Sequence, residues 1–211
     1  DAITALDYPT FEEFQVMQQD PSREAFLQND DLVIAVRVGA EERAYPVNIL
    51  NWHEVINDEF GGLALSITHC PLTGTSKVWR RDTRDGFPKF GVSGLVYNSN
   101  LLAFDRETNS FWTQLEGACV FGDRKGDELV LYPHVETTWA TWRSFHISPL
   151  VMSENTGIDR NYREYPYGEY RTNHNSISYP LAFDDDRLPR KERVFNIFLD
   201  GKAKVYRLSD F

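Results

Sequence analysis

The chain has 211 residues, of which 41% are hydrophobic, 14% aromatic and 26% charged, and this composition excludes a disordered tail or a membrane-embedded chain. Its 22 Lys and Arg residues against 32 Asp and Glu give a net charge of −10, which repels phosphate backbones and argues against nucleic acid as a partner. The longest apolar runs, such as 32–36, are far shorter than the roughly 20 residues of a membrane-spanning helix, so no integral membrane segment is expected.

The first 30 residues are expected to form a helical arm. Thr10 and Glu13 have the spacing of a helix-capping box, and apolar residues then recur at helical spacing as far as Met17. A second short helix is expected over 22–28. The first residue is Asp1 rather than Met, which indicates a processed or trimmed chain.

A β-hairpin is expected next, because apolar residues alternate over 33–38 and a Gly39-Ala40 turn leads into 43–45. The same pattern returns without a gap at 194–206, at a constant offset of 161 residues. Either two amphipathic hairpins share a period, or one element is duplicated. We expect the two hairpins to pair or pack at one end of the sheet system. The chain stops as the second copy ends, which makes Phe211 a candidate boundary.

The middle of the chain predicts many short strands. A helix is expected over 47–58 and another over 138–145, and 157–192 is expected to be a long ordered loop. Turn signals separate expected strands at 63–69, 76–80, 87–92, 95–104, 111–115 and 128–132. These features predict a mainly β (α+β) fold with short helices, built as one antiparallel, barrel- or sandwich-like domain over 1–211. Its expected parts are the arm 1–30, the core 31–156, the loop 157–192 and the second hairpin 193–211.

Cys70 is the first candidate for chemistry. Pro71 stops its strand from continuing inside a ladder, so we expect Cys70 at a strand end that faces a pocket. The short Gly61-Gly62 turn folds the expected helix with His53 back over this strand. Together they form either a thiolate–imidazolium pair or two ligands of a soft metal, and the alternative is a buried Cys beside a core His. His69 is expected to point to the opposite side of the strand.

Later strands carry a second group of candidates. Trp112 and Gln114 share one face of an expected strand, and with Asn98 they are candidates to line the mouth of a pocket. Asp105 and Arg106 end a strand at a turn, where Arg106 can make a bidentate salt bridge. A structural role is the alternative for each of these residues. Fixed metal-ligand spacings and phosphate-binding glycine motifs are absent from the sequence.

Longer motifs connect these residues to a known family. The motifs are Arg43 to Pro46, Ile49 to Glu54, Asn57-Asp58, Gly61-Gly62, Thr68 to Gly74, Phe90 to Leu95, Tyr97 to Leu101, Asp105 to Thr108, Ser110 to Gln114, Gly117, Thr137 to Trp139 and Pro166 to Gly168. Over most of its length the chain resembles the prokaryotic family called domain of unknown function 3179. Many members look like Tyr-Cys-Pro-Leu-Cys where this chain has His69 to Thr73, so a two-cysteine site is ruled out and any shared function rests on Cys70.

The resemblance implies that six residues match motif positions of the family: His53, Cys70, Asp105, Arg106, Trp112 and Gln114. It also implies an extracytoplasmic protein, periplasmic or secreted, since many members look exported. The family name states no activity, so the function must come from the residues.

Two functional hypotheses follow. The first is a binding protein whose pocket around Cys70 and His53 holds a small ligand or a soft metal such as copper. The second is an enzyme that uses Cys70 as a nucleophile or redox thiol and His53 as base, with Asp105, Arg106 and Gln114 positioning the substrate. A structural or interaction module is the remaining alternative.

The second cysteine, Cys119, is expected to be a buried apolar residue that forms no disulfide with Cys70. A disulfide would remove the only evident chemistry of Cys70, and the family pattern has a cysteine at position 70 but no recognised one at position 119.

Overall fold

The computed structural model describes residues 3–13, 16, 26–146 and 149–210. These residues form a mainly β fold with the short helices α3 (Val47–His53) and α4 (Trp139–Phe145), as the sequence predicts. The expected helices at 10–17 and 22–28 fall partly outside the described residues. Within them, Phe11–Glu13 is a strand rather than a helix, because it pairs with Leu150–Met152.

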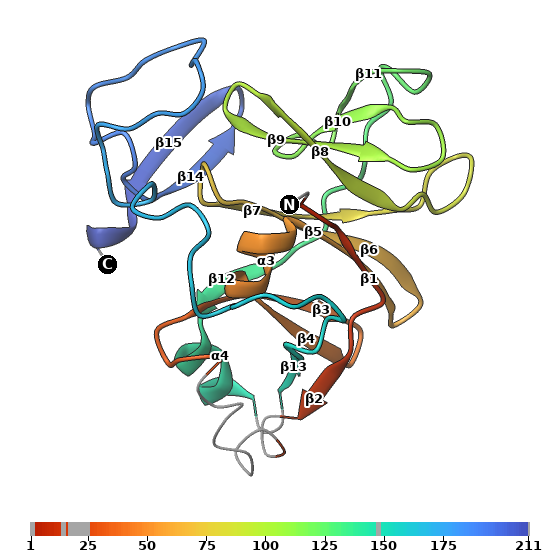
Figure 1. Cartoon of the computed structure of the whole chain (residues 1–211). Helices are drawn as coiled ribbons and strands as arrows, with labels where there is room; N and C mark the ends of the chain where they lie inside the picture. Colours follow the sequence, from red (N-terminus) through yellow and green to blue (C-terminus); the bar gives the residue numbers. More distant parts are fainter. Residues whose placement is uncertain (1–2, 14–15, 17–25, 147–148, 211) are drawn as a thin grey trace.

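Three sheets are stacked on one another (Figure 1). The middle sheet has the order β1 (Leu6–Asp7), β5 (Val55–Phe60), β6 (Leu63–Cys70), β7 (Thr75–Arg80). Above it lies the sheet β11 (Cys119–Phe121), β10 (Phe111–Thr113), β9 (Asn100–Asp105), β8 (Phe90–Tyr97). Below it lies the sheet β12 (Val135–Thr138), β3 (Leu32–Val38), β4 (Glu41–Pro46), β13 (Leu150–Met152), β2 (Phe11–Glu13). The arrangement is sandwich-like, and none of these sheets closes into a barrel in the described part of the chain.

The middle sheet separates two hydrophobic clusters, because successive side chains of a strand point to opposite faces. The lower cluster holds Ile56, Ile67 and Val78 together with the residues of β3 and β4. The upper cluster holds Val55, Cys70 and Trp79 together with residues of β8, β9 and β10. The position of a residue along β5, β6 or β7 therefore decides which cluster its side chain joins.

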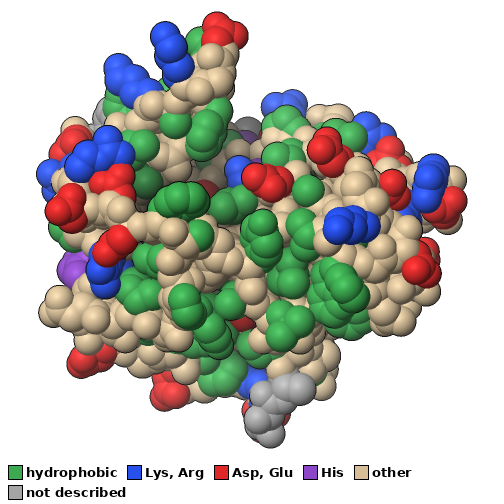
Figure 2. All heavy atoms as spheres, turned by 90° about the horizontal axis from the view of Figure 1, so that it is seen from above, with side chains coloured by type: hydrophobic (Ala, Val, Ile, Leu, Met, Phe, Trp, Pro, Cys, Tyr) green, Lys and Arg blue, Asp and Glu red, His purple; other side chains and the backbone are tan. Residues whose placement is uncertain are grey.

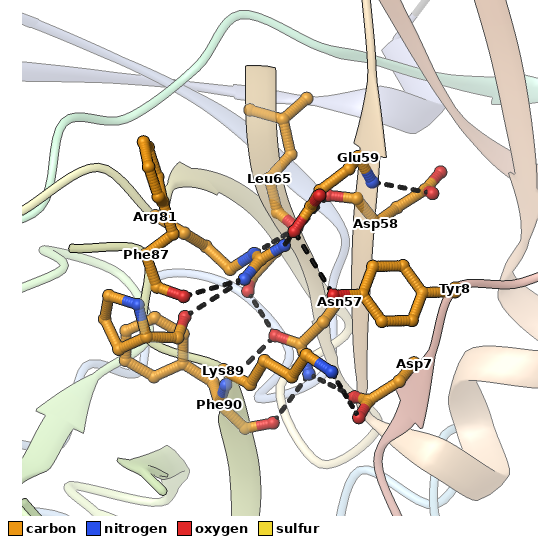
Figure 3. Close-up of polar contacts among 12 residues, drawn as sticks. Asp7, Tyr8, Asn57, Asp58, Glu59, Leu65, Arg81, Phe87, Lys89 and Phe90 are labelled. Atoms are coloured by element: carbon orange, nitrogen blue, oxygen red, sulfur yellow. Dashed lines mark hydrogen bonds and ion pairs between the residues drawn. The ribbon is translucent and has the colours of Figure 1, made fainter. Parts of the chain in front are cut away.

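A buried polar cluster at one end of the middle sheet is centred on Asn57 in β5 and on Arg81, the residue after β7 (Figure 3). We call it the Arg81 cluster. The guanidinium of Arg81 donates to the carbonyl oxygens of Leu65, Phe87, Pro88 and Asp58, and to the carboxylate of Glu59. Asn57 donates from Nδ2 to Asp7 and to the Phe90 carbonyl, and its Oδ1 accepts from Ser66 and from the Phe90 N–H. This cluster joins the middle sheet to β8.

One expected helix is shorter than the sequence predicts. The sequence predicts a helix over 47–58, but α3 ends at His53 and β5 begins at Val55. The β-branched Val55 and Ile56 favour a strand, and the following glycine turn pairs β5 with β6 as a hairpin. Gly61 has φ +56° in that turn, and a Cβ on it would lie 2.5 Å from Val38.

Strand boundaries in the upper sheet also differ from the prediction. The expected break at Ser93-Gly94 is a β-bulge inside β8, and the turn to β9 lies at Asn98-Ser99. Residues 128–132 make isolated bridges through Glu128 and Leu131 rather than a strand. The strands β11, β12 and β13 were not predicted, since each has only three or four residues.

Two hairpins stand near the two ends of the chain, as expected, and their registers correspond residue by residue. In β3–β4, Ile34 faces Tyr45, and in β14 (Val194–Leu199) and β15 (Lys202–Arg207), Phe195 faces Tyr206. The expectation that they pair or pack at one end of the sheet system is wrong: β14–β15 forms its own sheet, followed by the 3-10 helix η1 (Leu208–Asp210). The two hairpins lie far apart in Figure 1. The first copy is completed by β12 and β13 instead of by the second copy.

Among the described helices, none has the length and apolar character that crossing a membrane requires.

Candidate functional site

Cys70 is the last residue of β6 and is 2% exposed. Its side chain joins the upper cluster, and Pro71 then leads into the turn that returns as β7. The Gly74 N–H donates to the Cys70 carbonyl at 2.9 Å and closes this turn. The structure thus confirms a cysteine at a strand end. Cys119 is buried as well, and the two cysteines are unbonded, as the sequence predicts.

Two opposing effects set the acidity of the Cys70 thiol. Burial raises its pKa above the ordinary value, and this effect prevails. Hydrogen bonds from the Thr73 side chain and from backbone groups of Thr73, Leu101 and Leu72 act in the opposite direction. The Cys70 thiol is therefore a weaker acid than an ordinary cysteine, although these hydrogen bonds reduce the effect of its burial.

Glu54 occupies the abrupt junction between α3 and β5. Its φ is +57°, a region that non-glycine residues rarely adopt. Glu54 adopts it because the strand β5 follows the helix α3 with no linker between them. Its N–H donates to the Leu50 carbonyl and its carbonyl accepts from the His69 N–H, both at 2.8 Å. The second bond fixes Glu54 beside the end of β6, next to Cys70. Its side chain is buried, and burial raises the pKa of its carboxyl group to about 7.

The long loop 157–192 closes over Glu54 and Cys70 with two tyrosines. Tyr167 donates its hydroxyl to Glu54 Oε1 at 2.9 Å, and Tyr165 donates to the Pro71 carbonyl at 3.0 Å. Burial raises the pKa of Tyr167, and the nearby Glu54 and Cys70 raise it further. Glu54, Tyr167 and Cys70 thus lie within electrostatic reach of one another.

These groups line a cavity of about 180 Å³. Its polar lining is Glu54, Cys70, Tyr167 and Ser178, and its remaining lining comes from β8, β9, the Cys70 turn, the N-terminal segment and the long loop: Ile3, Leu72, Gly94, Leu95, Val96, Leu101 and Tyr179. The β-bulge in β8 places Gly94 at its wall. We call this cavity the Cys70 pocket.

His53 does not line the Cys70 pocket. Both of its ring nitrogens have partners at 2.7 Å, the Thr4 carbonyl on Nδ1 and the Tyr162 hydroxyl on Nε2. Tyr162 belongs to the lower cluster, whereas Cys70 belongs to the upper one. Burial lowers the pKa of His53, so the ring is neutral at neutral pH. Glu54 takes the place beside Cys70 that the sequence predicts for His53, because α3 ends at His53 and Glu54 is the first residue after it.

His69 points away from Cys70, as the sequence predicts. Its Nδ1 lies 3.1 Å from the Ser76 hydroxyl, which donates to Glu136 Oε2 at 2.6 Å. Because Ser76 uses its hydrogen for Glu136, the hydrogen on Nδ1 is assigned to His69. Complete burial lowers the pKa of His69 to about 4.

Gln114 supports the Cys70 turn without lining the pocket. Its Oε1 accepts from Thr75 and from Asn100, each at 2.8 Å, and its Nε2 donates to Thr68 Oγ1 and to the Thr75 carbonyl. Asn98 also lies outside the pocket lining, and its Oδ1 accepts from the Ala182 N–H at 2.8 Å. This bond holds the loop segment that carries Ser178 and Tyr179 to the pocket.

Asp105, Arg106 and Trp112 lie outside the pocket lining. Asp105 caps the turn after β9 by accepting from Thr108, and it also accepts from Trp112 Nε1 at 2.9 Å. Arg106 pairs with Asp7 at 2.8 Å. These bonds give all three residues a place in the framework that joins β9, β10 and β1.

Groups of three or more His, Cys, Asp and Glu side chains suited to a metal ion do not occur in the described ranges. The Cys70 pocket offers one thiol and one carboxyl group.

Sequence reasoning missed Glu54 and Tyr167 as pocket residues. In the predicted helix over 47–58, Glu54 faces solvent or caps a neighbouring loop, and Tyr167 lies in a loop without periodicity. The signal that was present is the resemblance itself, since Glu54 and Tyr167 both lie in motifs that carry it.

Comparison with known proteins gives one family. No curated protein and no solved structure matches the chain. The family described as protein of unknown function (DUF3179) matches residues 1–211, the whole chain. This chain therefore belongs to the DUF3179 family of proteins of unknown function.

Proposed function

We propose that the domain binds a small molecule in the Cys70 pocket, with Glu54, Tyr167 and Cys70 as its polar contacts. The observation that carries the proposal is the placement of a buried carboxyl group of raised pKa beside a cysteine and a tyrosine, all around an open volume. Titratable groups with perturbed pKa values gather at functional sites, and apolar pockets with a few convergent polar groups are typical of ligand sites.

The size and lining of the pocket restrict the ligand. About 180 Å³ is less than the roughly 300–1,000 Å³ of pockets for drug-sized molecules, so the ligand is small. The lining is mostly apolar, and a carboxyl group with a pKa of about 7 is half protonated at neutral pH. This combination favours an uncharged ligand that bears one hydrogen-bonding group opposite Glu54.

The pocket favours a small molecule over a soft metal. Copper and similar ions bind stably to several convergent Cys, His or Met ligands, whereas the pocket supplies Cys70 alone of these. Metal analysis of untagged protein checks this choice, and stoichiometric metal that a Cys70→Ser variant loses would contradict it. The extracytoplasmic location implied by the family resemblance stays a prediction.

A fragment screen by ligand-observed NMR tests the proposal. Small uncharged fragments are expected to bind the wild-type protein and to lose binding in Ser178→Trp, which fills the pocket from the loop. The matched control is Ser176→Trp, on the same loop but outside the lining, and it is expected to keep binding. Fragments that bind all three proteins equally would place the binding site elsewhere.

A second candidate function is thiol catalysis, because Cys70 and Glu54 line the same pocket. Hydrogen bonds from Thr73, Leu101 and Leu72 partly offset the effect of burial on the pKa of the Cys70 thiol, and Glu54 at a pKa of about 7 can accept its proton. Cys70 is then the nucleophile and Glu54 the base, in place of His53.

The rate of alkylation of Cys70 by iodoacetamide distinguishes catalysis from binding. If Glu54 is the base, the rate rises with pH with a midpoint near 7, and Glu54→Gln removes that midpoint. Cys119 reacts in both proteins and is excluded by measuring each thiol separately by peptide mass spectrometry. A Cys70 that stays unreactive until well above pH 9 favours ligand binding without covalent chemistry.

A further inference from the structure

The two oxygens of the Glu54 carboxyl group have different surroundings. Oε1 accepts a hydrogen bond from the Tyr167 hydroxyl at 2.9 Å. Oε2 has no hydrogen-bond partner among the residues that the structure describes, although Glu54 is only 7% exposed and lines the Cys70 pocket. A buried polar group without a partner costs free energy, and a ligand that pairs with it removes that cost. Oε2 is therefore an atom of the pocket wall at which a polar ligand gains a hydrogen bond.

The bond from Tyr167 also determines where the neutral carboxyl group carries its hydrogen. A protonated carboxyl group donates from one oxygen and accepts at the other. Because Oε1 accepts from Tyr167, the hydrogen belongs on Oε2. Neutral Glu54 thus faces the pocket as an O–H donor, whereas ionised Glu54 offers the pocket only an acceptor.

The surroundings of Glu54 favour the neutral form. Among the described residues, the pocket lining includes no Lys, Arg or His that would stabilise a negative charge. The titratable groups around the carboxyl group are Cys70 on β6 and Tyr165 and Tyr167 on the long loop. Burial raises the pKa of each of these three groups, so none is ionised at neutral pH. His53, the preceding residue in α3, is neutral as well.

The rest of the pocket suits an apolar body. Val96 and Leu101 line it from β8 and β9. Leu95 and Tyr179 line it too and are 54% and 42% exposed, so they lie where the pocket meets solvent. Figure 2, which looks down on the end of the molecule with β8 and β9, shows hydrophobic side chains gathered across the middle of that face. Apolar surroundings of this kind disfavour a charged ligand.

We propose that the ligand of the Cys70 pocket is a small carbonyl compound with an apolar body, whose oxygen accepts a hydrogen bond from Glu54 Oε2. The inference rests on the proposed function and adds the chemical class of the ligand. A ketone or aldehyde oxygen accepts hydrogen bonds and donates none, which matches a single O–H donor in an apolar wall. An alkylammonium ion instead brings a charge and three N–H donors, which this wall leaves poorly paired.

Cyclopentanone and pyrrole test the proposal, because they are rings of similar size that offer only an acceptor and only a donor. Their dissociation constants are measured by ligand-observed NMR titration at pH 5 and pH 8. At pH 8 about one Glu54 in ten keeps its proton, so cyclopentanone is expected to bind about tenfold more weakly than at pH 5. Glu54→Gln is expected to remove this pH dependence, because its amide group donates at both pH values. The control Glu169→Gln, exposed and outside the lining, is expected to keep it.

The outcomes separate this inference from the proposed function. Cyclopentanone that binds equally at both pH values overturns the inference, and so does a pH dependence that Glu54→Gln retains. Pyrrole that binds at pH 8 more tightly than cyclopentanone binds at pH 5 overturns it as well. In each of these cases, fragment binding that Ser178→Trp abolishes still supports a ligand site in the pocket. If no fragment of any kind binds there, the inference and the proposed function fail together.

Discussion

The Arg81 cluster and the Cys70 pocket are both buried polar regions on the middle sheet, and they differ in how their polar groups are paired. In the Arg81 cluster, the guanidinium and the Asn57 amide meet carbonyl, carboxylate and amide partners. In the Cys70 pocket, Glu54 and Cys70 have pKa values raised by burial and face a cavity. Paired polar groups stabilise a fold, whereas polar groups that are buried at a cost around a cavity indicate a site.

The largest expected effect lies in the Arg81 cluster. Arg81→Met should lower the free energy of unfolding by about 4 kcal/mol, because several buried carbonyl groups lose their hydrogen-bond donor. Urea unfolding measures the effect. Arg84→Met is the control, since Arg84 is exposed and pairs with the exposed Asp85, and it should change stability by less than about 0.5 kcal/mol. Equal effects of the two substitutions would contradict this prediction, because the cluster would then stabilise the fold no more than an exposed ion pair does.

The next effect concerns Glu54 and depends on pH. The pKa of Glu54 is raised from 4.5 to about 7, so the folded protein keeps a proton that the unfolded chain has released in this interval. Relative to Glu54→Gln, the wild type should therefore lose about 3 kcal/mol of stability as pH rises from 4.5 to 7. Unfolding both proteins across this range gives the comparison, and parallel curves would mean that the carboxyl group is solvated.

His69 should give the opposite slope. Its pKa falls from 6.5 to about 4, so its contribution is fully present above pH 6.5 and is lost as pH falls toward 4. Between pH 4.5 and 6.5 the pH dependences of Glu54 and His69 have opposite signs. Together these two groups should therefore change the stability of the wild type little in this interval. In Glu54→Gln the loss of stability due to His69, about 3 kcal/mol as pH falls from 6.5 to 4, should become visible, and adding His69→Gln should remove that contribution and leave those of His53 and His134, whose pKa values burial also lowers. A double variant that keeps the slope would assign it to another group.

The smallest effect isolates the backbone strain at Glu54. At pH 5, where the Glu54 carboxyl group is neutral, Glu54→Gly should be about 1 kcal/mol more stable than Glu54→Ala, because glycine adopts φ +57° at little cost. Both variants lack the pocket carboxyl group and should bind no fragment. Equal stabilities would mean that the backbone at residue 54 moves out of the φ +57° conformation in the alanine variant. The hydrogen bonds to Leu50 and His69 would then not enforce this conformation.

The sequence predicted features that depend on local pattern. Alternation predicted both hairpins, and Pro71 placed Cys70 at the end of a strand. Glu54 could not be found in this way, because the helical spacing of Ile49, His53 and Ile56 continues through a junction that only the pairing of β5 with β6 creates. The separation of His53 from Cys70 has the same cause, since it depends on which face of the middle sheet each residue joins. The pairing of β3 with β12 and of β4 with β13 could not be predicted, because β12 and β13 have only four and three residues.

The titration of Glu54 tests the central claim most directly. The ¹³C shift of its carboxyl carbon, assigned by its loss in Glu54→Gln, should move with a midpoint near pH 7, and a fragment bound in the pocket should displace that midpoint. A midpoint near 4.5 that no fragment changes would contradict the account, because Glu54 would then be an ordinary solvated carboxyl group and the Cys70 pocket would be no site.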